Sequence, residues 1–166
     1  MWGIRGLRTS SGEKVFLGVN ALNLDTKGRL AIPAKYRDEL ADCCGSRVVA
    51  TISPWDRCLL LYPDSEWREI ARKVSRLPNA KRQNQLLQRL LLGHATELEM
   101  DGQGRILLAP ALRDYASLDK RVALVGQGHK FEIWSEEVWL DKRDAWLAEA
   151  GDPGSGLSAE LEELSL

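Results

Sequence analysis

A pattern of apolar segments and polar turns occurs twice along the chain, and such a repeat decides how the other motifs are grouped. A mostly apolar segment over 19–24 leads into a polar tetrad at 25–28, and a second apolar segment leaves it at 29–32. The same order returns over 97–108. A turn-type tetrad between two segments with strand character predicts a tight hairpin in each copy.

The two predicted turns also share residues. The first copy reads Asn-Leu-Asp-Thr-Lys-Gly-Arg-Leu-Ala-Ile-Pro from position 23, and the second reads Glu-Met-Asp-Gly-Gln-Gly-Arg-Ile-Leu-Leu-Ala-Pro from position 99. The identical pairs at the turns are Asp25 with Asp101, Gly28 with Gly104, and Arg29 with Arg105. We call these two turns, residues 25–29 and 101–105, the tips.

The segment after each tip predicts a short helix and then a second hairpin. Pro33 and Pro110 end the preceding strand and suit the first turn of a helix, which we expect over 34–40 and 111–115. Further apolar segments, two in each copy, are expected to form the second hairpins. These segments are 48–52 and 59–62, then 122–125 and 131–134. Each unit is therefore expected to contain two hairpins and one short helix.

Helical spacing of apolar residues between and after the copies predicts a connector and a C-terminal helix. The predicted segments are an N-terminal extension and first strand entry at 1–18, repeat 1 at 19–66, a helical connector at 67–94, repeat 2 at 95–138, and a C-terminal helix with an acidic tail at 139–166. One repeat has too little core to fold alone and leaves strand edges open. We therefore expect an α+β fold in which hairpins of the two repeats interleave as a pseudo-twofold, swapped-hairpin β-barrel, with the helices outside.

Composition and charge narrow the class of protein. The chain has 166 residues, 44% of them apolar, and a net charge of −1. Its longest uninterrupted apolar stretch, 106–112, is far shorter than the roughly 20 residues that span a bilayer, and the N-terminus lacks the apolar region of a secretory signal. We therefore expect a cytoplasmic protein. The last 19 residues carry five acids and no base, which leaves +4 on the rest; this balance is compatible with nucleic acid but does not require it.

No residue pattern points to a metal, a cofactor or a catalytic centre. Cys43 and Cys44 are adjacent and Cys58 stands alone, so the spacing suits neither zinc nor redox chemistry, and buried free thiols are expected. His94 and His129 have no Cys, Asp or Glu at metal-ligand spacing. The sequence also lacks the glycine patterns of dinucleotide and phosphate loops and a nucleophile elbow. We predict that the protein is not an enzyme.

The residues around both tips carry a family resemblance. GRLAIP at 28–33 followed by Arg37, and GRILLAP at 104–110 followed by Arg113, resemble the AbrB-type swapped-hairpin DNA-binding fold. Two such copies in tandem, joined by a connector containing RLLLGHA, and with CLLLYP in the first copy, resemble the MraZ family. The resemblance covers about residues 16–147. Residues 1–14 depart from the family pattern and are assigned no role.

What this resemblance implies is a bacterial transcriptional regulator, usually a repressor of its own promoter ahead of a cluster of cell-division and cell-wall genes. Family members assemble into rings and bind short direct repeats in double-stranded DNA. We therefore expect a nucleoid-associated homo-oligomer. The sequence leaves open whether the stripe Leu86, Leu87, Leu90 and Leu91 and the helix of Trp67 pack in the intrachain core or between subunits.

Two interpretations of the tips compete. In the first, Asp caps the turn and pairs with Arg purely as turn chemistry. In the second, Asp25 and Asp101, with Gly28 and Gly104, hold the turns and orient the arginines. The DNA-binding residues are then expected to be Arg29, Arg105 and Lys27. A guanidinium bridges guanine O6 and N7, or a phosphate, with two parallel hydrogen bonds. Lys27 adds a phosphate contact in the first copy only, because Gln103 replaces it in the second.

The motif alone is weak, since Asp64 and Arg68 repeat its spacing in the connector, where an ordinary helical ion pair is expected. Two other functions are therefore compatible with the sequence. One is a structural, ring-forming protein-interaction module without specific DNA binding, in which Asp and Arg pair between subunits. The other is an antitoxin of the same fold class, which needs a long toxin-wrapping tail that the short acidic end matches poorly.

Overall fold

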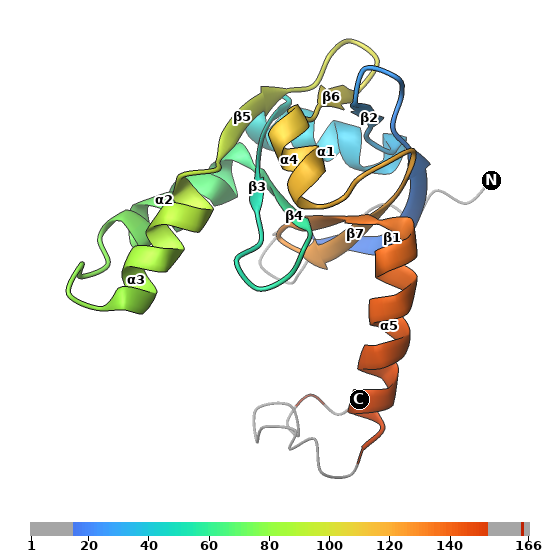
Figure 1. Ribbon diagram of the computed structural model, residues 1–166. Helices are drawn as coiled ribbons and strands as arrows, with labels where there is room; N and C mark the ends of the chain where they lie inside the picture. Colours follow the sequence, from blue (N-terminus) through green and yellow to red (C-terminus); the bar gives the residue numbers. More distant parts are fainter. Residues whose placement is uncertain (1–14, 153–163, 165–166) are drawn as a thin grey trace. The chain divides into compact units, whose positions relative to one another are not determined.

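The computed structural model describes residues 15–152 and Leu164 (Figure 1). The predicted extension at 1–14 and most of the acidic tail lie outside the described residues. Two compact units divide the chain after Glu136. The first contains all the described strands, and the second contains the helix α5 (Glu136–Ala150) apart from its first residue.

The elements alternate between short strands and short helices. The strands of the described residues are β1 (Phe16–Asn23), β2 (Arg29–Ala31), β3 (Arg47–Ile52), β4 (Leu59–Pro63), β5 (Thr96–Glu99), β6 (Arg105–Leu107), β7 (Arg121–Gly128) and β8 (Phe131–Ser135). Besides α5, the helices are α1 (Ala34–Cys44), α2 (Asp64–Ser75), α3 (Arg82–Leu87) with the π-helical turn η1 (Gln88–Leu92), and α4 (Pro110–Tyr115). The fold is therefore mixed α and β, as predicted.

Strands from both halves of the chain build the sheets. The larger sheet has the antiparallel order β1-β7-β8-β4-β3-β5, and β2 pairs with β6 in a separate two-stranded ribbon. The second hairpin of each copy forms within the copy, as β3–β4 and β7–β8. All other pairings, β1–β7, β4–β8, β3–β5 and β2–β6, join the first half of the chain to the second.

Two predictions about the sheets are wrong. The segments that flank each tip do not pair as the two strands of a local hairpin, because β1 pairs with β7 and β5 pairs with β3. The isolated bridge Leu24–Leu30 and the hydrogen bonds within the turn join the two sides of the first tip. Neither sheet closes into a barrel. The physical reason is that β2 and β6, each only three residues long, pair with each other in a separate ribbon rather than with the outer strands of the larger sheet. They therefore do not bridge the outer strands β1 and β5.

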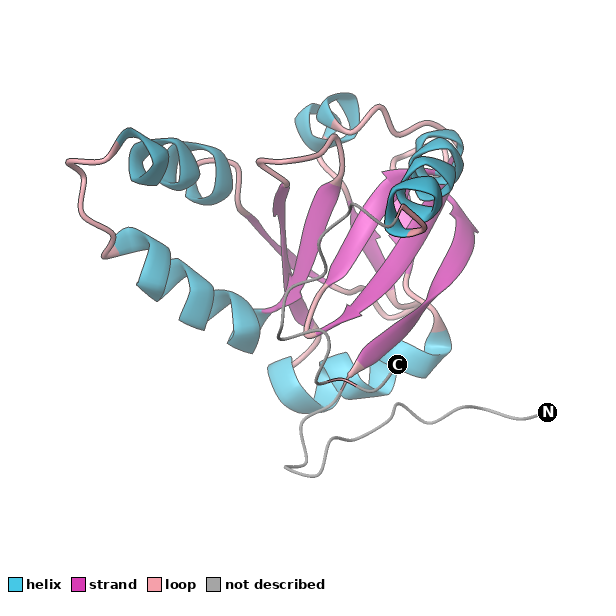
Figure 2. Ribbon diagram, turned by 90° about the horizontal axis from the view of Figure 1, so that it is seen from below, coloured by secondary structure: helices cyan, strands magenta, loops and turns pink. Residues whose placement is uncertain are grey.

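The larger sheet separates two hydrophobic cores. One core, on the side of α1 and α4, includes Leu30 and Ile106, which are fully buried and lie directly opposite each other in the β2–β6 ribbon. The other core lies under α2 and η1, the pair of helices on the left of Figure 2 that packs beside the strands. Trp67 and Leu91 are buried there, so the intrachain core takes both, whereas Leu86 stays exposed.

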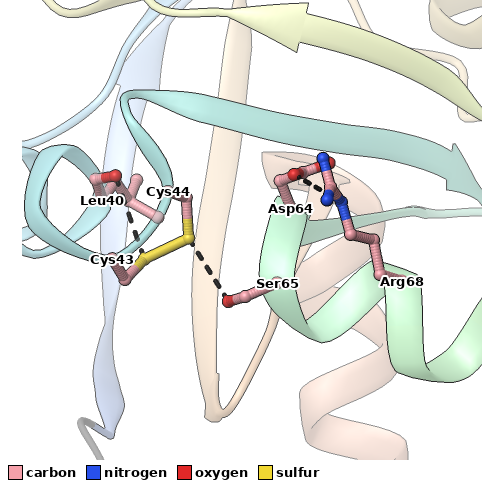
Figure 3. Close-up of a disulfide and its surroundings, with 6 residues drawn as sticks. All are labelled: Leu40, Cys43, Cys44, Asp64, Ser65 and Arg68. Carbon is pink, nitrogen blue, oxygen red and sulfur yellow. Dashed lines mark hydrogen bonds and ion pairs between the residues drawn. A yellow bond between two sulfur atoms is a disulfide. The ribbon is translucent and has the colours of Figure 1, made fainter.

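The cysteines differ from the prediction of free thiols. Cys43 and Cys44, at the end of α1, form a disulfide bond (Figure 3). The Cys44 sulfur also lies 3.3 Å from the Ser65 hydroxyl at the start of α2. Both residues lie in the last turn of α1, and spacing rules for separated cysteines do not consider such adjacent residues. Only Cys58 is the buried free thiol that the sequence predicted, and burial raises its pKa.

Candidate nucleic-acid interface

Each tip is held by one aspartate. In the first tip, Asp25 Oδ1 accepts hydrogen bonds from the backbone N–H groups of Lys27 and Arg29, both at 2.9 Å, and Oδ2 lies 2.6 Å from Arg29 Nε. The Gly28 N–H donates to the Asp25 carbonyl at 3.0 Å. One side chain thus satisfies two backbone donors of the turn and also fixes the plane of the guanidinium.

The second tip reproduces this geometry. Asp101 Oδ1 accepts from the N–H groups of Gln103 and Arg105 at 2.9 and 3.0 Å, and Oδ2 lies 2.8 Å from Arg105 Nε. Gly28 and Gly104 have φ values of +82° and +72°, a region that glycine enters without a steric penalty. The structure therefore places all six shared residues of the two tips in matching positions.

The β2–β6 ribbon brings the two tips together on one surface. Because Leu30 and Ile106 point into the core, their neighbours along each strand point outward. The outward residues are Arg29, Ala31, Arg105 and Leu107. The register pairs Arg29 with Leu107 and Ala31 with Arg105, so the arginines occupy diagonal positions, with Cα atoms roughly 7–8 Å apart. Figure 1 shows the two strands side by side, each preceded by its tip loop.

Both guanidiniums are available to a ligand. The side chains of Arg29 and Arg105 are 30% and 28% exposed, and within the described part of the chain they are bonded to Asp only through Nε. The two terminal nitrogens of each therefore remain as donors. Lys27 is exposed at the first tip, and Gln103 occupies the equivalent exposed position at the second.

The third pair with the Asp-x-x-x-Arg spacing lies in a helix and not in a turn. Asp64 and Arg68 form an ion pair of 2.9 Å along α2, with the arginine largely exposed. This agrees with the expected helical pair. Across residues 15–152, no cluster of three or more His, Cys, Asp or Glu side chains could hold a metal ion, and no helix there is long and apolar enough to cross a membrane.

The tip aspartates are expected to titrate below their ordinary range. The backbone N–H of Arg29 is the largest cause that lowers the pKa of Asp25, and the Arg105 N–H does the same for Asp101. Since the folded-state pKa is depressed, the stabilisation by these carboxylates is present above the ordinary value of 3.8 and is lost as the pH falls through the lowered value.

We expect carbon-detected NMR titration to give midpoints below 3.8 for both carboxyl groups. In Arg29→Ala and Arg105→Ala variants the midpoints should rise only in part, because the backbone donors remain. Midpoints at or above 3.8 in the unmodified protein would contradict the tip geometry.

Sequence reasoning assigned no role to two further arginines near the tips. Arg37 in α1 lies against Gly104, and Arg113 in α4 lies against Gly28. The sequence feature that could have pointed to them is that Arg37 follows Pro33 and Arg113 follows Pro110 at similar positions in the two repeats.

Comparisons with known proteins identify the relatives of this chain. A family model described as "MraZ protein, putative antitoxin-like" matches residues 15–90 and again 91–147. Proteins named "Transcriptional regulator MraZ" are 57% identical in Thioalkalivibrio sulfidiphilus, 53% in Halorhodospira halophila and 49% in Pseudomonas aeruginosa. Each alignment spans 152 residues and covers 92% of this chain and 100% of the relative.

Proposed function

The chain belongs to the MraZ family, and from this premise we propose that it is a transcriptional regulator that binds promoter DNA through the outer face of the β2–β6 ribbon. The names of its relatives support a role in transcription regulation. The observation that carries the DNA contact is the pair of matching tips, each with a half-exposed arginine held by its aspartate.

The ribbon has the dimensions and donors that DNA recognition needs. The major groove of B-DNA admits a two-stranded β-ribbon, and a guanidinium donates two parallel hydrogen bonds to guanine or to a phosphate. Because Asp25 and Asp101 hold the Nε atoms, both guanidiniums are oriented before DNA arrives. Such preorganisation reduces the entropy lost on binding. Lys27 supplies a phosphate contact at the first tip.

Two arginine tips per chain give modest affinity, so we propose that the protein acts as a ring-shaped homo-oligomer. Tips at fixed spacing then engage direct repeats in the protein's own promoter, which it represses, and several weak contacts add on one DNA molecule. Exposed apolar side chains support self-association: Trp55 and Leu86 are exposed and line a common groove with Leu87. Leu86 is the part of the leucine stripe that the core leaves uncovered.

Fluorescence anisotropy with a duplex from the protein's own upstream region tests this function. We expect the wild type to prefer this duplex to a scrambled one. Arg29→Ala plus Arg105→Ala should weaken binding at least tenfold, since each bidentate arginine contact is worth about 1–3 kcal/mol. Arg72→Ala plus Arg143→Ala, which removes the same charge at other surface positions, should retain binding.

The oligomer mass separates this function from its rival. Light scattering should give one mass for the wild type and the tip variant. If the wild type shows no sequence preference, or if the tip variant dissociates into smaller species, the tips serve assembly and the protein is a structural ring module.

A further inference from the structure

We propose that Arg37 and Arg113 are phosphate-binding residues, and that each completes the tip of the opposite repeat. This inference rests on the proposed DNA binding and adds the residues that supply the tips with net positive charge. Arg37 belongs to α1 in the first half of the chain and serves the second tip, whereas Arg113 belongs to α4 in the second half and serves the first.

The crossing is visible in the packing around the tip glycines. A Cβ atom at Gly28 would lie 2.7 Å from Arg113 Cζ, and one at Gly104 would overlap the Arg37 side chain. Both glycines are therefore needed for two reasons, their positive φ and the guanidinium that lies on them. The backbone crosses in the same way, because the Ile32 N–H donates to the Gly104 carbonyl at 2.9 Å and the Leu108 N–H donates to the Gly28 carbonyl at 3.0 Å.

Both arginines are anchored in a manner that leaves their ends available. Arg37 Nε donates to the Ile32 carbonyl at 2.6 Å, and Arg113 Nε donates to the Leu108 carbonyl at 3.1 Å. These carbonyls lie just before the helices that carry the arginines. With Nε fixed, the two terminal nitrogens of each side chain are the remaining donors. The tip arginines are held by the same device, except that there the acceptor is a carboxylate.

Charge distinguishes the two kinds of arginine. Asp25 neutralises Arg29 and Asp101 neutralises Arg105, so the shared motif by itself has no net charge. In the described part of the chain Arg37 and Arg113 form no ion pair, although the exposed Asp38 and Asp114 follow them directly. A half-buried guanidinium anchored only by a neutral carbonyl favours an anion at its free edge.

The salt dependence of DNA binding tests this assignment, because the slope of log affinity against log salt falls by roughly 0.9 for each phosphate contact that is lost. The full chain is titrated with its upstream duplex between about 50 and about 200 mM salt. We expect Arg37→Met plus Arg113→Met to reduce the slope by about 2 and to weaken binding at least about tenfold at the lower salt. Methionine preserves the apolar stem and removes the charge.

Two further pairs act as controls. Arg37→Lys plus Arg113→Lys retains the charges and should retain the slope. Arg72→Met plus Arg143→Met removes two charges that are paired with Glu69 and Asp144 elsewhere on the surface, and it should leave affinity and slope unchanged. If the Met pair unfolds at a lower temperature than the wild type, the slope of the salt dependence still separates the two roles. Loss of a purely structural arginine would not reduce this slope, and restoring the charge in the Lys pair would not change it.

Three outcomes overturn the assignment. The first is that the variant Arg37→Met plus Arg113→Met binds DNA as tightly as the wild type. The second is that this variant binds more weakly but with an unchanged slope of log affinity against log salt, which would make both arginines structural. The third is that the wild type does not bind DNA. If the wild type binds and the Arg29, Arg105 variant does not, the proposed function stands even when this inference fails. If the wild type does not bind DNA, both fail.

Discussion

If the chain is cut in the loop between α2 and α3, we expect each half to be unfolded as a monomer. A cut between Asn79 and Ala80 divides β1, β2 and β4 from their partners β7, β6 and β8. Each half would then lose the strands that cover its edges and the side chains that fill the shared core. The expected loss is the whole net stability of a domain, about 5–15 kcal/mol.

Circular dichroism and denaturant titration of each half check this expectation, with the mass followed by light scattering. Mixing the halves should restore a cooperative transition. A full chain with a short Gly-Ser insertion at the same site is the control, because it disturbs the loop without removing any strand partner, and it should remain folded. A half that folds cooperatively as a monomer would contradict the pairing between halves. A folded dimer of one half would not, because a second copy can replace the missing partner.

Leu30→Ala should be strongly destabilising although it lies next to an exposed tip residue. Leu30 is fully buried and faces Ile106 at the centre of the β2–β6 ribbon. Deleting its outer methyl groups leaves a cavity, and such changes destabilise folded proteins by about 2–5 kcal/mol. Ile106→Ala at the equivalent position of the other repeat should lose a similar amount. Urea unfolding at one fixed protein concentration measures both, which avoids the concentration dependence of an oligomer.

Leu107→Ala is the matched control for this pair. Leu107 lies on the same ribbon but on its outer face, where it is 55% exposed. Its loss should change the free energy of unfolding by no more than about 0.5 kcal/mol. Equal effects of Leu30→Ala and Leu107→Ala would show that the ribbon is not a boundary between core and surface.

The second hairpins show what local sequence patterns predict well. Two apolar segments separated by a short polar turn predicted β3–β4 and β7–β8, and both pairs form. The partner strands are neighbours along the chain, so the entropy lost on pairing them is small. The prolines likewise indicated α1 and α4, because a fixed φ and a missing N–H act within a few residues.

The segments around the tips show the limit of the same reasoning. An apolar pattern tells which face of a strand is buried, but it does not tell which strand supplies the hydrogen-bond partner. The prediction chose the nearest segment for β1, whereas the structure pairs it with β7 along its full length. That long antiparallel pairing also explains why β7 extends to Gly128, beyond the predicted 122–125.

In the candidate site, too, the local contacts were predictable from sequence and the contacts between repeats were not. The link between Asp25 and Arg29 spans four residues, so turn chemistry predicts it from sequence, and the second tip follows by repetition. The placement of Arg37 against Gly104 depends on the contact between opposite repeats, and no pattern within one repeat contains it. The bond between Cys43 and Cys44 escaped prediction for another reason, since rules based on separated cysteines do not consider adjacent ones.

The sequence by itself determined the repeat, the chemistry of each tip, the starts of α1 and α4, and the second hairpins, because each depends on interactions between residues close along the chain. Only the tertiary structure decided that β2 pairs with β6, that the large sheet stays open, and that each tip lies beside an arginine of the other repeat. These features depend on which strand edges and side chains meet after the two halves pack together. Their free energy comes from contacts between residues far apart in sequence, and it is therefore absent from any local pattern.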